Sequence, residues 1–203
     1  QSVVVDTDPN LQEYISTEVE NGILVISVQN KNNLKLNFKK LLVTVEAPQL
    51  SSVRVSSGSL LTTLNTINEN DFQANISSGA NLNADLNIRN KTNVSISSGS
   101  SMRMDVKTKN FQLAGSSGSS STVVGNAENT TFSLSSAASC NAQDLISKNA
   151  TASASSGASL KINTTENLTA TASSGASIRY KGNPRNFIGS GKSSSGGTVQ
   201  PLN

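Results

Sequence analysis

The residues best placed for chemistry in this chain are two aspartates with an arginine beside them. Asp85 and Asp105 each lie six residues after the glycine of a Ser-Ser-Gly triplet, and Arg103 precedes Asp105 by two residues. Equal offsets from a repeated motif predict side chains about 5 Å apart on adjacent strands. A close acid pair with a basic residue nearby is an arrangement that polysaccharide hydrolases and lyases could use.

A surface charge pair is the alternative interpretation of these aspartates, and the sequence favours it. Arg103 and Lys107 are near enough in sequence to relieve the repulsion between the carboxylates. The same offset holds Val124 and Gln143 in the next two repeats, so no third acid is expected in this column. The segments between strands are also too short to wall a pocket. No catalytic residue is predicted, and the chain is not expected to be an enzyme.

Serine and cysteine are weaker candidates. The chain has no histidine, which excludes a Ser-His-Asp triad, and it has no Gly-x-Ser-x-Gly motif. A Ser-Lys pair is conceivable at Lys192 and Ser193, whose Gly-rich surroundings indicate a flexible tail. The single cysteine, Cys140, takes a repeat position that apolar residues hold elsewhere, so it is expected to fill the core. Without a Cys/His ligand pattern, no metal or cofactor site is predicted.

The composition excludes further classes of function. The net charge of +3 comes from 16 basic and 13 acidic residues, and Lys39-Lys40 is the only adjacent basic pair. Nucleic-acid binding needs a clustered basic face, so it is not expected. No stretch approaches the roughly 20 apolar residues that span a bilayer. The hydrophobic fraction of 34% is low, but the small polar residues recur in periodic order, which indicates a narrow core rather than disorder.

A Ser-Ser-Gly triplet recurs along most of the chain, and this repeat predicts the fold. Successive triplets are 18 to 21 residues apart, with Ala137 in place of glycine once. A period of about 20 residues is typical of a solenoid, in which each repeat is a coil stacked on the last. The glycines are Gly58, Gly79, Gly99, Gly118, Gly157, Gly175 and Gly196.

Apolar and polar residues alternate on both sides of each triplet. Positions at odd offsets from the glycine are apolar or small, and those at even offsets are mostly polar, which is the pattern of strands with one buried face. Each coil is therefore expected to be two short strands flanking the triplet, closed by a polar turn such as 89–91 or 165–167. Inward-facing serines are expected to bond to hydroxyls or carbonyls of adjacent coils. The fold class is predicted as all-β, a single-stranded, right-handed β-helix-like solenoid of about eight coils.

Residues 1–55 lack the repeat and are predicted to form a β-strand cap of the same domain. Asn21-Gly22 lies between two β-rich runs, which indicates a hairpin with a tight turn. A second strand pair is expected between 34–38 and 41–45. Residues 56–203 are predicted to be the solenoid, with a closing coil that contains Phe187-Ile188 and Thr198-Val199.

The order of these segments resembles a bacterial envelope family described as putative autotransporter adhesin, head GIN domain. The resemblance rests on four segments and covers essentially the whole chain. They are 18–24 (EVENGIL), 48–50 (PQL), the iterated Ser-Ser-Gly-Ser/Ala, and 178–184 (IRYKGNP). It implies a β-helix-like fold, export to the envelope, and an adhesive or scaffold role, and it carries over no catalytic residue.

Two functions are therefore kept open. The first is a non-enzymatic exported envelope protein, an adhesin or surface scaffold, in the periplasm, on the outer membrane or outside the cell. The second is a carbohydrate-binding or polysaccharide-processing β-helix protein. The expected partner is a surface ligand, either a glycan or a protein of the host or cell surface. A lipid anchor upstream of Gln1 and homo-oligomers formed through strand edges or the N-terminal cap are further expectations.

Overall fold

The computed structural model describes residues 1–29, 34–189 and 195–202, and the chain divides into two compact units, Gln1–Pro48 and Gln49–Asn203. Nearly all regular structure in both units is β-strand, with one short 3-10 helix. Among the described residues, no helix is long and apolar enough to span a membrane.

The N-terminal unit contains two antiparallel strand pairs. The first joins β2 (Ile15–Glu20) to β3 (Ile23–Val28) through Asn21 and Gly22, whose φ angles of 50° and 79° are those of a type I′ turn. The hairpin predicted from Asn-Gly is confirmed. The 3-10 helix η1 (Pro9–Tyr14) precedes β2 and places Leu11 in the interior.

The second predicted strand pair is wrong. β4 (Leu41–Glu46) pairs with β1 (Ser2–Thr7), not with residues 34–38, which are not a strand. The β-branched run Val3-Val4-Val5 makes β1 the better partner. Asp8 Oδ2 also accepts the Lys39 N–H at 2.7 Å, which holds the chain before β4 in a turn.

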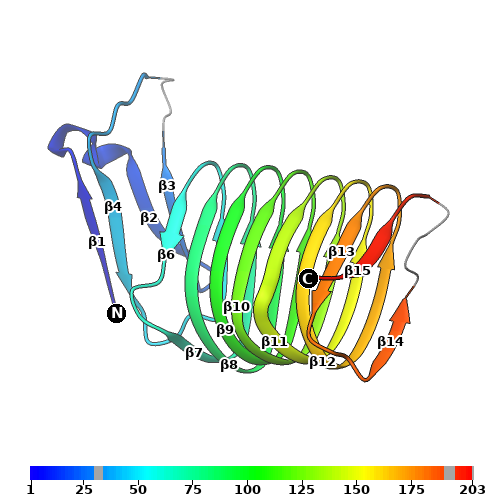
Figure 1. The fold of residues 1–203 in the computed structure, drawn as a ribbon. Helices are drawn as coiled ribbons and strands as arrows, with labels where there is room; N and C mark the ends of the chain where they lie inside the picture. Colours follow the sequence, from blue (N-terminus) through cyan, green and yellow to red (C-terminus); the bar gives the residue numbers. More distant parts are fainter. Residues whose placement is uncertain (30–33, 190–194, 203) are drawn as a thin grey trace. The chain divides into compact units, whose positions relative to one another are not determined.

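The second unit is a solenoid of about eight stacked coils, and its strands pair in parallel along one continuous sheet (Figure 1). Because each coil supplies the next strand of the sheet, residues one period apart lie side by side. The unit begins with β5 (Ser52–Val55), which pairs with β7, so the last residues of the predicted cap segment 1–55 form a strand of the solenoid. The strands that follow are β6 (Leu60–Thr62), β7 (Ile67–Ile76), β8 (Asn81–Ile96), β9 (Ser101–Gly115), β10 (Ser120–Leu134), β11 (Ser139–Ala154), β12 (Ser159–Ala172), β13 (Ser177–Lys181), β14 (Asn186–Gly189) and β15 (Thr198–Pro201).

The segments between successive triplets do not contain the polar turns that were predicted there. Residues 89–91 and 165–167 lie inside the long strands β8 and β12, so each full coil is one bent strand rather than two short strands closed by a turn. The bend is a register irregularity, for example between Ile88 and Lys91. Pairing with neighbouring coils continues through the bend because a bulge turns a strand without ending its ladder.

The odd-offset residues form the solenoid core, as predicted. Side chains such as Leu82, Met104 and Leu160 are almost completely buried, and the rings of Phe111 and Phe132 lie 5.9 Å apart in neighbouring coils. Alanine fills much of the later coils, which keeps the core narrow. Burial of these rows on consecutive strands gives the stack its main apolar stabilisation.

The triplets from 56–58 to 173–175 are type I′ turns on the outside of the coil. At Ser98 and Gly99 the φ angles are 56° and 68°, and the Ser100 N–H donates to the Ser97 carbonyl at 3.3 Å. The Gly99 N–H also donates to the Ser117 carbonyl of the next coil at 3.0 Å, so the turns form a ladder of their own. A Cβ on Gly99 would meet nothing within 4 Å. Glycine is therefore favoured here for its backbone conformation and not for space.

The alanine at the turn position predicts a stabilising change. Ala137 has a φ of 59°, a left-handed conformation that costs an L-residue roughly 1–2 kcal/mol. Ala137→Gly is expected to raise the free energy of unfolding by about 1 kcal/mol after the extra entropy cost of glycine. Urea denaturation would measure it. Ala138→Gly, one residue later and buried, is the control and should be destabilising; a loss of stability in both variants would contradict this account of the turn.

Only part of the expected pairing of inward serines occurs. Ser147 Oγ donates to the Asn163 carbonyl at 3.1 Å and accepts from Thr130 Oγ1 at 3.2 Å, as predicted. Ser100, Ser119 and Ser121 are buried, and their hydroxyls have no partner among the described residues. Ser100 and Ser119 lie directly after the turn glycine, where the adjacent turn carbonyls already accept backbone N–H groups. The prediction was wrong at these three positions.

These unpaired hydroxyls predict a second stabilising change. Ser119 takes the place that Ala80, Ala138 and Ala158 hold in other coils. An unsatisfied buried hydroxyl costs about 1–3 kcal/mol, so Ser119→Ala is expected to raise the free energy of unfolding by about 1 kcal/mol. Thermal melts would measure this change, and the neighbouring exposed substitution Ser120→Ala is the control, which should be close to neutral. If Ser119→Ala destabilised the protein while Ser120→Ala did not, the Ser119 hydroxyl would have a partner.

Candidate functional site

The structure brings Asp85 and Asp105 together as register partners on β8 and β9. Parallel strands are about 4.8 Å apart, so the two carboxylates project side by side from one surface. Both residues are exposed, and Arg103 is exposed two positions before Asp105. Like charges directly opposite one another on adjacent strands are destabilising.

A third acid lies in this column, contrary to prediction. Val124 pairs with Asp105, and Asp144 pairs with Val124, because β11 carries an additional residue between Asn141 and Asp144. The insertion shifts Gln143 out of the place that its offset predicts. Asp144 is therefore two coils from Asp105, about 10 Å away by strand spacing, with Val124 between them.

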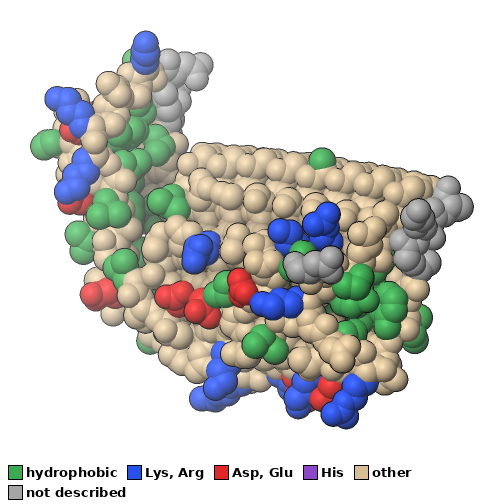
Figure 2. All heavy atoms as spheres, viewed as in Figure 1, with side chains coloured by type: hydrophobic (Ala, Val, Ile, Leu, Met, Phe, Trp, Pro, Cys, Tyr) green, Lys and Arg blue, Asp and Glu red, His purple; other side chains and the backbone are tan. Residues whose placement is uncertain are grey.

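A shallow groove of about 290 Å³ accompanies the first two aspartates. It is lined by Asp85, Arg103, Asp105 and Val124, together with Thr62, Thr63, Asn83 and Ala84. The Asp85 N–H donates to Thr63 Oγ1 at 3.0 Å, which fixes the backbone beside the carboxylate. Figure 2 shows acidic and basic side chains gathered on this surface, with no enclosed cleft between them.

The remaining candidates have no site around them. Cys140 is fully buried beside Ser121 and Leu160, and burial raises the pKa of its thiol to about 12. A thiol that stays protonated is a poor nucleophile, so the interpretation of Cys140 as core is confirmed. Lys192 and Ser193 lie outside the described residues. Within the described ranges, no three His, Cys, Asp or Glu side chains are grouped so as to hold a metal ion.

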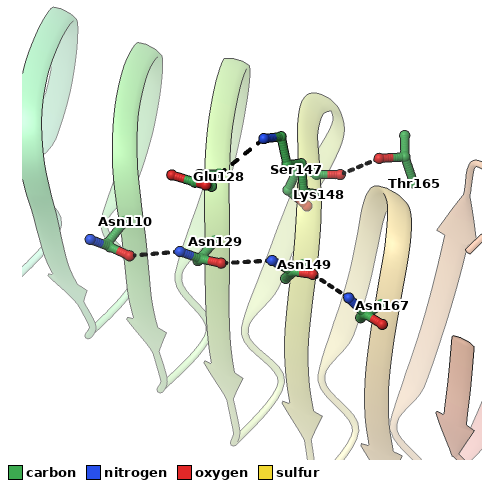
Figure 3. A network of polar contacts seen from close by, with 8 residues as sticks. All are labelled: Asn110, Glu128, Asn129, Ser147, Lys148, Asn149, Thr165 and Asn167. Carbon is green, nitrogen blue, oxygen red and sulfur yellow. Dashed lines mark hydrogen bonds and ion pairs between the residues drawn. The ribbon is translucent and has the colours of Figure 1, made fainter.

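A ladder of asparagines crosses the bent corner of the coils, and the sequence analysis missed it (Figure 3). Each Nδ2 donates to Oδ1 of the preceding coil: Asn129 to Asn110 at 3.0 Å, Asn149 to Asn129 at 2.9 Å, and Asn167 to Asn149 at 2.5 Å. Asn186 extends the ladder to Asn167 at 2.8 Å. The signal was present, because four of these asparagines lie eight residues before the turn position of their coil.

The ladder serves the architecture rather than chemistry. Its amides satisfy one another, and the neighbouring Glu128 and Lys148 form an ion pair at 3.8 Å (Figure 3). Buried hydroxyls bond to the corner carbonyls beneath it, as Thr164 Oγ1 does to Lys148 O at 2.9 Å. The ladder thus fixes the register of successive coils where the strand bends.

Comparison with protein families decides the family of this chain. The model for putative auto-transporter adhesin, head GIN domain, matches residues 1–184. The chain belongs to this family. A comparison with curated proteins found no match.

Solved structures share the fold of this family member at low sequence identity. A putative adhesin from Parabacteroides merdae is similar with a TM-score of 0.85 and 21% identity, over 99% of this chain and 83% of that one. A putative lipid binding protein from Parabacteroides distasonis is similar with a TM-score of 0.82 and 19% identity, over 99% of this chain and 84% of that one. A putative adhesin from Bacteroides fragilis is similar with a TM-score of 0.63 and 16% identity, over 95% of this chain and 78% of that one.

The geometry of the acid pair decides what it can do. Glycosidases place two carboxyl groups on either side of a bound glycosidic bond. Asp85 and Asp105 are register partners on adjacent strands, and both are exposed beside a shallow groove rather than enclosed in a cleft. The pair is suited to an exposed charge cluster, in which Arg103 supplies the compensating charge.

Proposed function

We propose that this chain is an exported, non-enzymatic surface protein that acts as an adhesin or scaffold. Membership of the adhesin family supports export and adhesion. The observation that carries the proposal is the open build of the solenoid, in which consecutive strands present in-register rows of polar side chains. Such rows favour many weak contacts with an extended surface partner over the enclosed contacts that catalysis needs.

The absence of a built catalytic centre at the acid pair supports a binding role over turnover. Polysaccharide processing is the competing function, and it would have to use Asp85 and Asp105, both of which are exposed. Catalytic carboxyl groups are usually held in environments that set their two ionisation states apart. The mixed charges that line the shallow groove are explained more simply as a solvated protein surface than as a catalytic site.

The proposal is tested with two measurements on the full chain. The first is the binding of fluorescently labelled protein to intact bacterial and epithelial cells, which is expected to saturate and to survive Asp105→Ala. The second is the release of reducing ends or unsaturated products from neutral and acidic polysaccharides, which is expected to stay at the level of buffer. Turnover that disappears in Asp105→Ala would overturn the proposal in favour of polysaccharide processing.

Export is tested separately on cells that produce the full-length protein. Protease added to intact cells should degrade the solenoid if it faces outward, and periplasmic protein should become accessible only after the outer membrane is opened. Retention in the cytoplasm after both treatments would contradict export.

A further inference from the structure

The two walls of the solenoid differ sharply in charge. The Ser-Ser-Gly turn reverses the chain, so the segments before and after it form opposite walls around the core (Figure 1). The wall after the turn carries the aspartates together with Arg103, Lys161 and Arg179. The wall before the turn has two outward rows, six and four residues ahead of the turn position, and across six coils they contain no charged residue.

We call these two rows the uncharged face. The first row is Gln73, Asn93, Gln112, Thr131, Thr151 and Thr169, and the second is Asn75, Ser95, Ala114, Ser133, Ser153 and Thr171, each in register with its neighbours. Arg54 precedes the second row at one end of the stack, and Ile188 follows the first row at the other. The uncharged face is thus bordered by a charged residue at one end and by an apolar residue at the other.

The amides of the uncharged face are free to bond to a ligand. Among the described residues, the side chains of Gln73, Asn93 and Gln112 make no hydrogen bond, although each lies next to another amide or hydroxyl in the row. The asparagine ladder at the corner behaves differently, because Asn129 and Asn149 use their amides on each other. These two sets of stacked polar side chains therefore differ: the ladder is consumed by the fold, and the uncharged face presents donors and acceptors outward.

A groove runs along the uncharged face across four strands. It has a volume of about 320 Å³ and is lined by both rows from β7 to β10, with Gln73, Asn93 and Gln112 on one side. The short side chains of Ser95, Ala114 and Ser133 leave it open on the other. Its length along the solenoid axis is about 14 Å, since neighbouring strands lie about 4.8 Å apart.

From these features we infer that the uncharged face binds a neutral polysaccharide lying along the solenoid axis; the inference rests on the proposed adhesive function. A neutral polymer fits because the face has no charge to neutralise an anionic or cationic ligand. Hydroxyl groups of sugars match amide and hydroxyl rows that repeat with each coil. Repetition over six coils lets weak contacts add along one chain.

A peptide partner fits the same face less well. Extended peptides add to an unpaired strand edge, whereas β8 to β11 are hydrogen-bonded on both sides. Protein interfaces are usually centred on buried aromatic or arginine anchors in pockets, and the uncharged face supplies neither an aromatic side chain nor an enclosed pocket.

The test measures the affinity of the full chain for neutral and anionic polysaccharides by affinity electrophoresis. Dextran, laminarin and yeast mannan are the neutral probes, and alginate is the anionic one. We expect at least one neutral probe to bind more tightly than alginate. Failure of all three neutral probes to bind with a Kd below about 10 mM would overturn the inference, as would tighter binding of alginate.

Two variants locate the binding surface. Ala114→Arg places a long charged side chain in the groove at an exposed position and is expected to weaken binding of the neutral probe about tenfold or more. Asn126→Arg adds the same side chain at an exposed position on the other wall and should leave affinity within about twofold. Equal affinities for the two variants, with unchanged melting temperatures, would contradict the assignment of the face.

The cell-binding assay separates this inference from the proposed function. If the chain adheres to cells and Ala114→Arg adheres equally well, the protein is an adhesin that uses another surface. If the wild type does not adhere to cells but binds a neutral probe, and Ala114→Arg abolishes that binding, the uncharged face is the binding surface and the proposed adhesive role is wrong.

Discussion

Gly125→Ala is expected to reduce the free energy of unfolding by about 4 kcal/mol or more, enough to prevent cooperative folding of the middle coils. Gly125 lies within β10 at a φ of 116°, and a Cβ there would be 2.2 Å from the Val106 carbonyl oxygen. That oxygen belongs to the backbone of the neighbouring strand, so it cannot move aside without breaking the ladder. Urea denaturation followed by circular dichroism would measure the loss.

Gly118→Ala is the matched control for this change. Gly118 also has a positive φ, of 68°, but a Cβ there would meet nothing within 4 Å. Ala137 shows that alanine can occupy the equivalent turn position. We expect a loss of about 1 kcal/mol for Gly118→Ala. A similar, small loss for Gly125→Ala would show that the close approach of the two strands is relaxed in solution.

Asn129→Ala is expected to cost about 2 kcal/mol, because it removes two hydrogen bonds and leaves Asn110 Oδ1 and Asn149 Nδ2 without their partner. Asn129 donates to Asn110 and accepts from Asn149, both near 3 Å, at partly buried positions. Asn126→Ala, three residues earlier in β10 and exposed, should change stability by less than about 0.5 kcal/mol. Thermal melts of the two variants would give the comparison.

A double-mutant cycle tests whether the ladder acts as a unit. Asn129→Ala and Asn149→Ala remove the same shared hydrogen bond, so their combined effect should be smaller than the sum of the single effects by about 1 kcal/mol. Additive effects would mean that the asparagines stabilise their coils independently.

The repeat made most of the fold predictable from the sequence, because Ser-Ser-Gly favours one backbone conformation, a tight turn. The positive φ of both central residues makes the triplets from 56–58 to 173–175 turns, and the alternation around them assigns the buried rows, including Cys140. Offsets counted from a glycine hold only while every coil has the same number of residues. The additional residue in β11 therefore brought Asp144, rather than Gln143, into register with Val124.

Features that depend on pairing between distant segments were harder to predict. β1 and β4 are separated by more than 30 residues, and local pattern alone made 34–38 a plausible partner for β4. The bend in each strand was mistaken for a turn because polar residues there resemble a loop, while the Asn110–Asn129 bond and its repeats actually continue the stack. Whether residues 1–55 cap the solenoid stays a prediction.

Chemical-shift mapping of the isotopically labelled chain with dextran, laminarin and mannan would test the central claim most directly. We predict that the backbone amides of Asn93, Gln112 and Ser133 and the side-chain amides of Asn93 and Gln112 shift on titration. The backbone amides of Arg103, Asp105 and Lys107 on the other wall should not shift. Shifts confined to the wall that carries Asp85 and Asp105, or no shifts with any of the three, would contradict binding through the uncharged face.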